Sequence, residues 1–170
     1  DGDDPDTTLV PTGIMNADET WTAADSPYCF DGDVQLNVGV TLTMEPGVMV
    51  GGNGYNLETF GTLSVQGTAL QRVEIDDLHI KPGPSSSTLF VMDINYAQIT
   101  GGSLYKGTGN SITGQLLLRD SVIKDMNNYL YLWYIAADSY IERNVFIRSG
   151  GISAGMSSIN LYVENNAFYE

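Results

Sequence analysis

The sequence predicts an all-β fold, a right-handed parallel β-helix (a solenoid) of about six coils with an acidic N-terminal leader or cap. A six-residue phrase with large apolar residues at both ends returns along the chain, starting 19, 23 and 22 residues apart. A repeat of about 20–25 residues with a short strand in each copy is typical of a solenoid. The 19 glycines suit a chain with many corners, and a charged fraction of only 16% argues against a helical bundle. The copies begin at Ile99, Leu118, Ile141 and Val163.

The phrase predicts a corner within each copy. In a straight strand, residues five positions apart point to opposite faces, because side chains alternate. Both ends of the phrase are apolar, so the chain must bend between them for both to reach one core. The fourth position carries a small or turn-forming residue, and we expect it to take the left-handed conformation that a sharp corner demands. These corner residues are Gly102, Ser121, Asn144 and Asn166.

An earlier pair of coils has the same period but a different turn. In VTLTMEPGVMV (40–50) and GTLSVQGTA (61–69), apolar residues alternate along a strand that ends in a turn. Leu42 and Leu63 are 21 residues apart, as are Met44 and Val65, so each pair is expected to stack on adjacent coils. A meander of antiparallel hairpins is the competing fold, but hairpins would not require the same corner residues at the same register.

The run GDVQLNVGVTLTMEPGVMVGGNGYNLETFGTLSVQGTALQRVEI (32–75) resembles the N-terminal coils of bacterial right-handed parallel β-helix repeat proteins of the pectin-lyase-like type. The resemblance covers residues 20–75 closely and residues 95–170 as the general repeat. It departs after Ile75, where HIKPGPSSST (79–88) replaces the Trp- and Gly-rich coil of those proteins. The family is functionally mixed and includes adhesins, surface proteins, carbohydrate-binding modules and polysaccharide-degrading enzymes. The resemblance therefore implies an extracellular or bacterial cell-surface location more firmly than it implies an activity.

The chain is expected to divide at residue 20. Residues 1–20 are polar and acidic, with Pro and Gly among them, and predict a flexible leader or cap. Residues 21–170 form the predicted β-helix domain, in which the aromatic segment 21–28 is expected to plug one open end. Loops that leave the coil are expected at 81–88, 105–110 and 127–134.

Charge excludes several partners. Residues 1–71 contain 11 acidic side chains and no Lys or Arg, and the formal net charge of the chain is −14. Such a surface repels nucleic acid and anionic membranes, and no apolar run is long enough to span a bilayer. The acidic, Lys-poor composition fits a secreted protein in saline or calcium-containing surroundings, and the competing explanation is solubility alone.

No cofactor is predicted beyond a weak calcium hypothesis. Carboxylates crowd the N-terminus as hard cations prefer, but the segment lacks the glycine and the closing glutamate of a calcium loop. A solvated acidic segment is the competing interpretation. The carboxylates are Asp1, Asp3, Asp4 and Asp6. Cys29 is the only cysteine, so it forms no intrachain disulfide and is expected to be a buried, inert thiol.

The segment NNYLYLWY (127–134) is the best binding candidate. Strand alternation places Tyr129, Tyr131 and Trp133 on one face and Leu130 and Leu132 on the other. If the leucines point inward, the three aromatic residues form an outward ladder on which sugar rings can stack. The competing interpretation places these aromatic side chains in the core or in a subunit contact.

Catalytic signals are weak. Asp120, Glu142 and Arg143 are expected near one another on successive coils, about 4.8 Å apart. They could form an acid–base pair of a polysaccharide-degrading enzyme, but opposite charges on neighbouring coils more simply stabilise the stack. His79 is the only histidine, and one histidine alone is a poor metal site.

These features predict a non-catalytic extracellular or cell-surface β-helix with a structural or adhesive role. Its expected partners are polysaccharide, other copies of the chain stacked head to tail, or a longer continuation of the same chain, because the last phrase (163–168) carries no capping segment. The alternative is a fragment of a polysaccharide lyase or glycoside hydrolase.

Overall fold

Parallel strands dominate the computed structural model, which describes residues 7–83, 90–104, 114–126, 128–133, 135–155 and 159–170. Every strand pair among these residues is parallel, and each strand pairs with strands three elements away along the chain. The predicted all-β parallel β-helix is therefore confirmed. Within the described residues, no helix is long and apolar enough to cross a membrane.

The strands form four sheets, here called A to D. Sheet A contains β1 (Thr8–Val10), β4 (Tyr28–Phe30), β7 (Met49–Gly51), β10 (Val73–Asp76), β13 (Ala97–Thr100), β16 (Val122–Lys124), β19 (Val145–Ile147) and β22 (Ala167–Tyr169). Sheet B contains β2 (Gly13–Met15), β5 (Val34–Leu36), β8 (Asn56–Thr59), β11 (His79–Pro82) and β14 (Ser103–Leu104). Sheet C contains β3 (Glu19–Trp21), β6 (Thr41–Met44), β9 (Thr62–Gln66), β12 (Phe90–Asn95), β15 (Gly114–Arg119), β18 (Ser139–Glu142) and β21 (Leu161–Glu164). Sheet D pairs β17 (Leu130–Trp133) with β20 (Ile152–Gly155).

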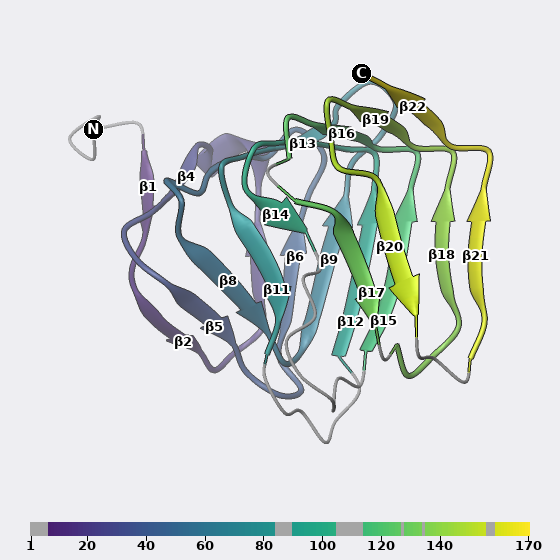
Figure 1. Ribbon diagram of the computed structural model, residues 1–170. Coiled ribbons are helices and arrows are strands. Elements are labelled where there is room, and N and C mark those ends of the chain that lie inside the picture. Colours follow the sequence, from purple (N-terminus) through teal and green to yellow (C-terminus); the bar gives the residue numbers. More distant parts are fainter. Residues whose placement is uncertain (1–6, 84–89, 105–113, 127, 134, 156–158) are drawn as a thin grey trace.

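Each coil takes one strand from each side of the molecule. In Figure 1 the chain rises through sheet C at the back, crosses sheet A at the top and descends through sheets B and D at the front. Because it advances from left to right as it does so, the coil is right-handed, the hand that parallel crossovers prefer. The strands β1 to β21 make seven groups of three, and β22 begins the next coil.

The described part of the expected leader is a coil of the solenoid. Residues 8–21 form β1, β2 and β3, which pair with β4, β5 and β6 of the next coil. The sequence did not predict this coil, because its side chains are polar and mostly exposed. Only a few of them, such as Val10 and Trp21, are apolar and point inward. Trp21 stacks on Tyr28 with ring centroids 4.5 Å apart, which places an aromatic layer near this end as expected.

The core consists of columns of inward side chains that repeat once per coil. Leu42 pairs with Leu63 and Met44 with Val65, and all four are fully buried, which confirms the stacking predicted from the 21-residue spacing. A second column, in sheet A, runs through Val50, Ile75, Ile99, Ile123, Phe146 and Phe168. Burying apolar side chains in such columns supplies most of the stability of the fold.

The corners differ from the sequence prediction in one respect. Left-handed backbone occurs at the third position of the phrase, with φ of 51° at Asp120, 56° at Arg143 and 55° at Asn165. The expectation for the fourth position is wrong for Ser121, Asn144 and Asn166, and it holds only for Gly102, whose φ is 57°. Asp and Asn tolerate this conformation because their short polar side chains bond locally.

The first copy of the phrase also lies at a different corner. Residues 99–104 connect sheet A to sheet B, whereas the copies that begin at Leu118, Ile141 and Val163 connect sheet C to sheet A. The true partner of Leu118 on the preceding coil is Ile94. Two corners of the coil therefore share one pattern, and spacing alone cannot distinguish them. The expected loop segments 84–88 and 105–110 lie outside the described residues, while Lys81 and Pro82 belong to β11. The loop expected at 127–134 is wrong for Leu130–Trp133, which form the strand β17 of the solenoid.

Candidate functional site

The aromatic strand β17 has the predicted two faces. Leu130 and Leu132 are fully buried in the core, whereas Tyr129 is 51% exposed and Tyr131 is half-buried. The two tyrosine rings lie edge to face, with centroids 5.9 Å apart and an interplanar angle of 76°. Trp133 ends the strand, and its side chain lies outside the described set. The alternation of leucine inward and tyrosine outward is thus confirmed.

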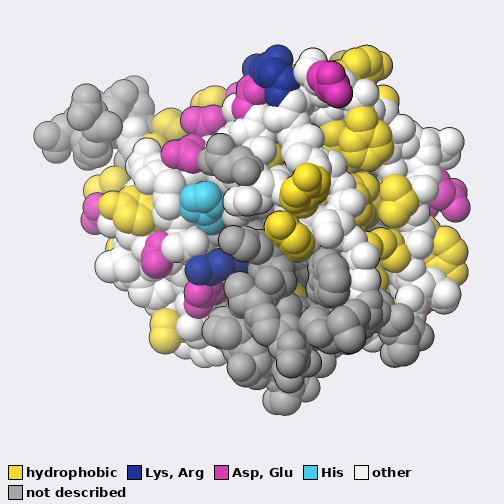
Figure 2. All heavy atoms as spheres, viewed as in Figure 1, with side chains coloured by type: hydrophobic (Ala, Val, Ile, Leu, Met, Phe, Trp, Pro, Cys, Tyr) yellow, Lys and Arg dark blue, Asp and Glu magenta, His cyan; other side chains and the backbone are white. Residues whose placement is uncertain are grey.

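Small residues follow on the next coil, beside the aromatic ones. Tyr131 pairs with Ser153 and Trp133 with Gly155, and Tyr129 lies beside Gly151, whose carbonyl accepts a hydrogen bond of 2.9 Å from the N–H of Leu130. No bulky side chain of β20 therefore covers the aromatic row on that side. Figure 2 shows hydrophobic side chains gathered over β17 and β20 on the front face. The side chains of Tyr129 and Tyr131 therefore stand beside the small residues Gly151, Ser153 and Gly155, and we call this arrangement the aromatic step.

This step has the chemistry of a carbohydrate surface. The apolar C–H face of a sugar packs on an aromatic ring while its hydroxyls stay in water or bond to polar groups. The Tyr129 and Tyr131 hydroxyls can exchange hydrogen bonds with sugar hydroxyls, because a phenol both donates and accepts. A sugar chain lying along the strand would meet aromatic side chains at every second residue, about 6.6 Å apart.

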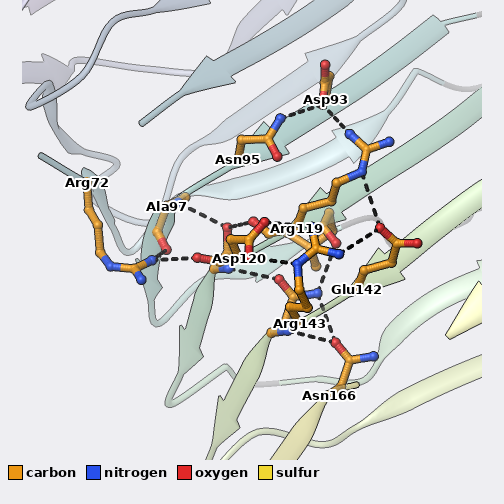
Figure 3. A network of polar contacts seen from close by, with 12 residues as sticks. Arg72, Asp93, Asn95, Ala97, Arg119, Asp120, Glu142, Arg143 and Asn166 are labelled. Atoms are coloured by element: carbon orange, nitrogen blue, oxygen red, sulfur yellow. Dashed lines mark hydrogen bonds and ion pairs between the residues drawn. The ribbon is translucent and has the colours of Figure 1, made fainter. Parts of the chain in front are cut away.

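Ion pairs join the charged residues of neighbouring coils. Figure 3 shows Arg143 beside Asp120, with Nε and Nη2 donating to the two carboxylate oxygens at 2.9 and 2.8 Å. Arg143 also contacts Glu142, at 3.2 Å. Arg119 lies between Asp93, at 3.4 Å, and Glu142, at 3.7 Å. The expected proximity of Asp120, Glu142 and Arg143 is confirmed.

Because their charges are paired, these residues hold neighbouring coils together. We call the cluster of Asp93, Arg119, Asp120, Glu142 and Arg143 the clamp. The hydrogen bonds from Arg143 lower the pKa of Asp120, with smaller contributions from other nearby arginines. A carboxyl group held ionised in this way is a poor general acid at neutral pH. The same geometry recurs at the next corner, where Arg148 Nε and Nη2 bond to Asp125 at 2.6 and 2.9 Å and lower its pKa.

A polar ladder runs inside the corner between sheets C and A. Asn144 Oδ1 accepts a hydrogen bond of 3.0 Å from the Ser121 N–H, and Asn166 Oδ1 accepts one of 2.9 Å from the Asn144 N–H. Each asparagine amide also donates to a carbonyl of a preceding strand, at Leu118 (2.9 Å) and Ile141 (2.8 Å). The fourth position of the phrase therefore serves backbone hydrogen bonding rather than left-handed turning. A buried amide at this point satisfies groups that the corner removes from the sheet.

Sequence reasoning missed one pair on the outer face of sheet B. His79 Nδ1 lies 2.9 Å from Ser103 Oγ, because a separation of 24 residues makes one coil. A serine beside a histidine suggests a nucleophile and its base. Ser103, however, is only 5% exposed, and its N–H bonds to the Leu78 carbonyl at 3.3 Å, so it does not provide an oxyanion donor. The stacking of His79 on Ser103 could have been found from the coil length alone.

Metal ligands do not converge in the described part of the chain, where no three His, Cys, Asp or Glu side chains are placed to hold an ion. The acidic residues Asp1, Asp3, Asp4 and Asp6 lie outside it, so the calcium hypothesis stays a prediction. Comparison of the chain with protein-family models, with curated proteins and with solved structures found no match. The functional argument therefore depends on the geometry of the surface.

Proposed function

We propose that this protein is a non-catalytic, extracellular or cell-surface β-helix with a structural or adhesive role, and that it binds glycans along β17. The observation that carries the proposal is the step formed by Tyr129 and Tyr131 above the small residues of β20. An outward aromatic row on a rigid strand is preorganised, because the buried leucines on its other face fix its orientation.

The proposed extracellular or cell-surface location of the protein is inferred from its sequence. Residues 20–75 resemble coils of bacterial pectin-lyase-like β-helix repeat proteins, many of which act outside the cell. The net charge of −14 further favours neutral glycans over polymers of uronic acids, since like charges repel.

Head-to-tail self-assembly finds less support. Glu19 pairs with the fully buried Leu42 and thus occupies an inward position in β3. A second copy stacked on this coil would have to bury the Glu19 carboxylate among apolar side chains. Inward charges of this kind oppose edge-to-edge pairing, so glycan is the better-supported partner.

Polysaccharide cleavage is the alternative function, and one experiment separates it from binding. The full chain is titrated with cellohexaose, xylohexaose and a hexamer of galacturonic acid by calorimetry, and each mixture is analysed for cleavage products by chromatography. We expect binding of a neutral hexamer without cleavage. Chain shortening would favour the lyase or hydrolase alternative, and failure of all three sugars to bind would contradict the proposal.

Two variants test whether the glycan binds along β17. The double variant Tyr129→Ala/Tyr131→Ala should weaken binding about tenfold or more, because two stacking contacts are lost. Tyr55→Ala serves as the matched control, since Tyr55 is 37% exposed and directly precedes β8, which β11 and β14 separate from β17. If Tyr55→Ala weakens binding as much as the double variant does, the glycan does not bind along β17.

A further inference from the structure

The outer face of sheet A carries a groove that neither the clamp nor the aromatic step uses. The groove has a volume of about 290 Å³ and crosses β4, β7, β10 and β13. Its lining includes Cys29, Met49, Gly51, Glu74, Asp76 and Gln98. Cys29 was expected to be buried; it is instead half-buried, between the inward side chains of Tyr28 and Phe30, and so faces this groove.

Gly51 leaves a gap in the outward row of side chains that lines the groove, and we call this gap the hollow. It lies in register between Cys29 on one side and Asp76 on the other. A Cβ atom built on Gly51 would lie 3.4 Å from Cys29 Sγ, an ordinary contact, and would meet no other atom within 4 Å. The hollow therefore exists because one side chain is missing from an otherwise continuous row.

Two carboxylates border the hollow without partners among the described residues. Glu74 and Asp76 are exposed, point outward from the same strand, and form no ion pair or side-chain hydrogen bond there. By contrast, Asp93 and Asp120 on sheet C and its corner are bound to arginines. A cation placed over Glu74 and Asp76 would meet two free acceptors.

One outward row of this face becomes apolar towards the C-terminus, while the neighbouring row carries Lys124, whose ammonium lies 3.8 Å from the Asp125 carboxylate. Gln98 pairs with Val122, and Val122 pairs with Val145, so two outward valines continue the row that begins at Met49 and Glu74. All members of this row are exposed or half-buried, so they lie at the surface of sheet A rather than in the core. The two valines lie two and three strands beyond Glu74, which is about 10 and 14 Å away.

We propose that the outer face of sheet A docks an extended basic polypeptide segment of a partner protein. Its Lys or Arg side chain lies over Glu74 and Asp76, and its aliphatic side chains lie on Val122 and Val145. An extended chain advances about 3.3 Å per residue, so the basic and aliphatic residues are three to four positions apart. The acidic charge of the whole chain supports a basic partner, because residues 1–71 carry no Lys or Arg. A polypeptide fits because one linear molecule then presents both a cation and aliphatic groups at this spacing.

Peptide selection tests the proposal directly, because the library itself supplies the candidate segments. A phage-displayed library of linear peptides of about seven residues, long enough to cross the groove and reach the valines, is selected on the full chain. The library is counter-selected on Gly51→Val, which fills the groove from the solvent side of the strand. Ser64→Val, an outward substitution of similar size on sheet C, is the control for added apolar surface. We expect recovered peptides to share a basic residue followed three or four positions later by aliphatic residues, and to bind Ser64→Val as they bind the unmodified chain.

A second set of variants keeps the test independent of the folding of Gly51→Val. For one synthesised peptide, Glu74→Gln/Asp76→Asn should reduce affinity at least about tenfold and remove most of its salt dependence. Glu45→Gln, an exposed carboxylate on another turn, should leave affinity unchanged. Circular dichroism confirms that each variant is folded. The proposal is overturned if no peptide is recovered, if the recovered peptides lack basic residues, or if the double variant and Glu45→Gln bind alike.

Discussion

The polar ladder makes a quantitative prediction at Asn144, whose side chain is 1% exposed. Truncation in Asn144→Ala removes the acceptor for the Ser121 N–H and the donor to the Leu118 carbonyl, at 3.0 and 2.9 Å. Leaving one buried backbone group without a partner costs about 1–3 kcal/mol, and a carbonyl loses less because it has a second lone pair. We therefore expect a loss of about 2–4 kcal/mol in the free energy of unfolding, or a Tm lower by roughly 6–12 °C.

Urea unfolding followed by circular dichroism measures this loss. Asn144→Ser should recover about half of it, because Ser121 already fills the same position one coil earlier and its Oγ accepts a hydrogen bond of 3.0 Å from the Ala97 N–H. Asn160→Ala is the control, since Asn160 is exposed and its bonds to Asp138 lie at the surface. A loss below about 1 kcal/mol for Asn144→Ala, or equal losses for the alanine and serine variants, would refute the reasoning.

Other positions give predictions of the same kind. Because Arg143 lowers the pKa of Asp120 below its usual 3.8, the ionised pair stabilises the fold above about pH 4, and this contribution is lost as pH falls through the folded-state pKa. Asp120→Asn should therefore lose less Tm than the unmodified chain between about pH 5 and about pH 2, as scanning calorimetry would show. Gly114→Ala should destabilise the fold by about 1–3 kcal/mol in urea unfolding, since the new Cβ would clash with the Phe90 ring; a neutral result would mean that the ring moves freely. Leu132→Ala should cost about 2–5 kcal/mol in the same assay because the side chain is fully buried, and a cost under about 1 kcal/mol would contradict its inward placement.

The core was predictable because its period is long and regular. Apolar residues 21 apart, such as Leu42 and Leu63, stack whenever one coil has that length, so the sequence predicts both the fold and the register there. The two faces of β17 were predictable for a similar reason, because Leu130 and Leu132 can satisfy only one side of a strand.

Other features depend on contacts that spacing does not encode. At both corners of a coil, two apolar residues lie five positions apart. The sequence therefore could not distinguish the corner at Ile99 from the corner at Leu118. Left-handed backbone at Arg143 was unexpected because an arginine has no intrinsic preference for it; the bidentate contact with Asp120 accompanies it in the folded chain. The coil at residues 8–21 was missed since its strands are short and mostly exposed.

Connections between sheets B and C differ widely in length, whereas the last three corners between sheets C and A (120–121, 143–144 and 165–166) have two residues each. Two residues (60–61) join β8 to β9, but nine (105–113) join β14 to β15, and the strand register on either side is unchanged. Loop closure becomes only slowly more costly as a loop lengthens, so this edge tolerates inserted sequence. The molecule thus offers a natural grafting edge: foreign segments of different lengths could be displayed there, side by side at one-coil intervals, while the asparagine ladder on the opposite corner keeps the framework aligned.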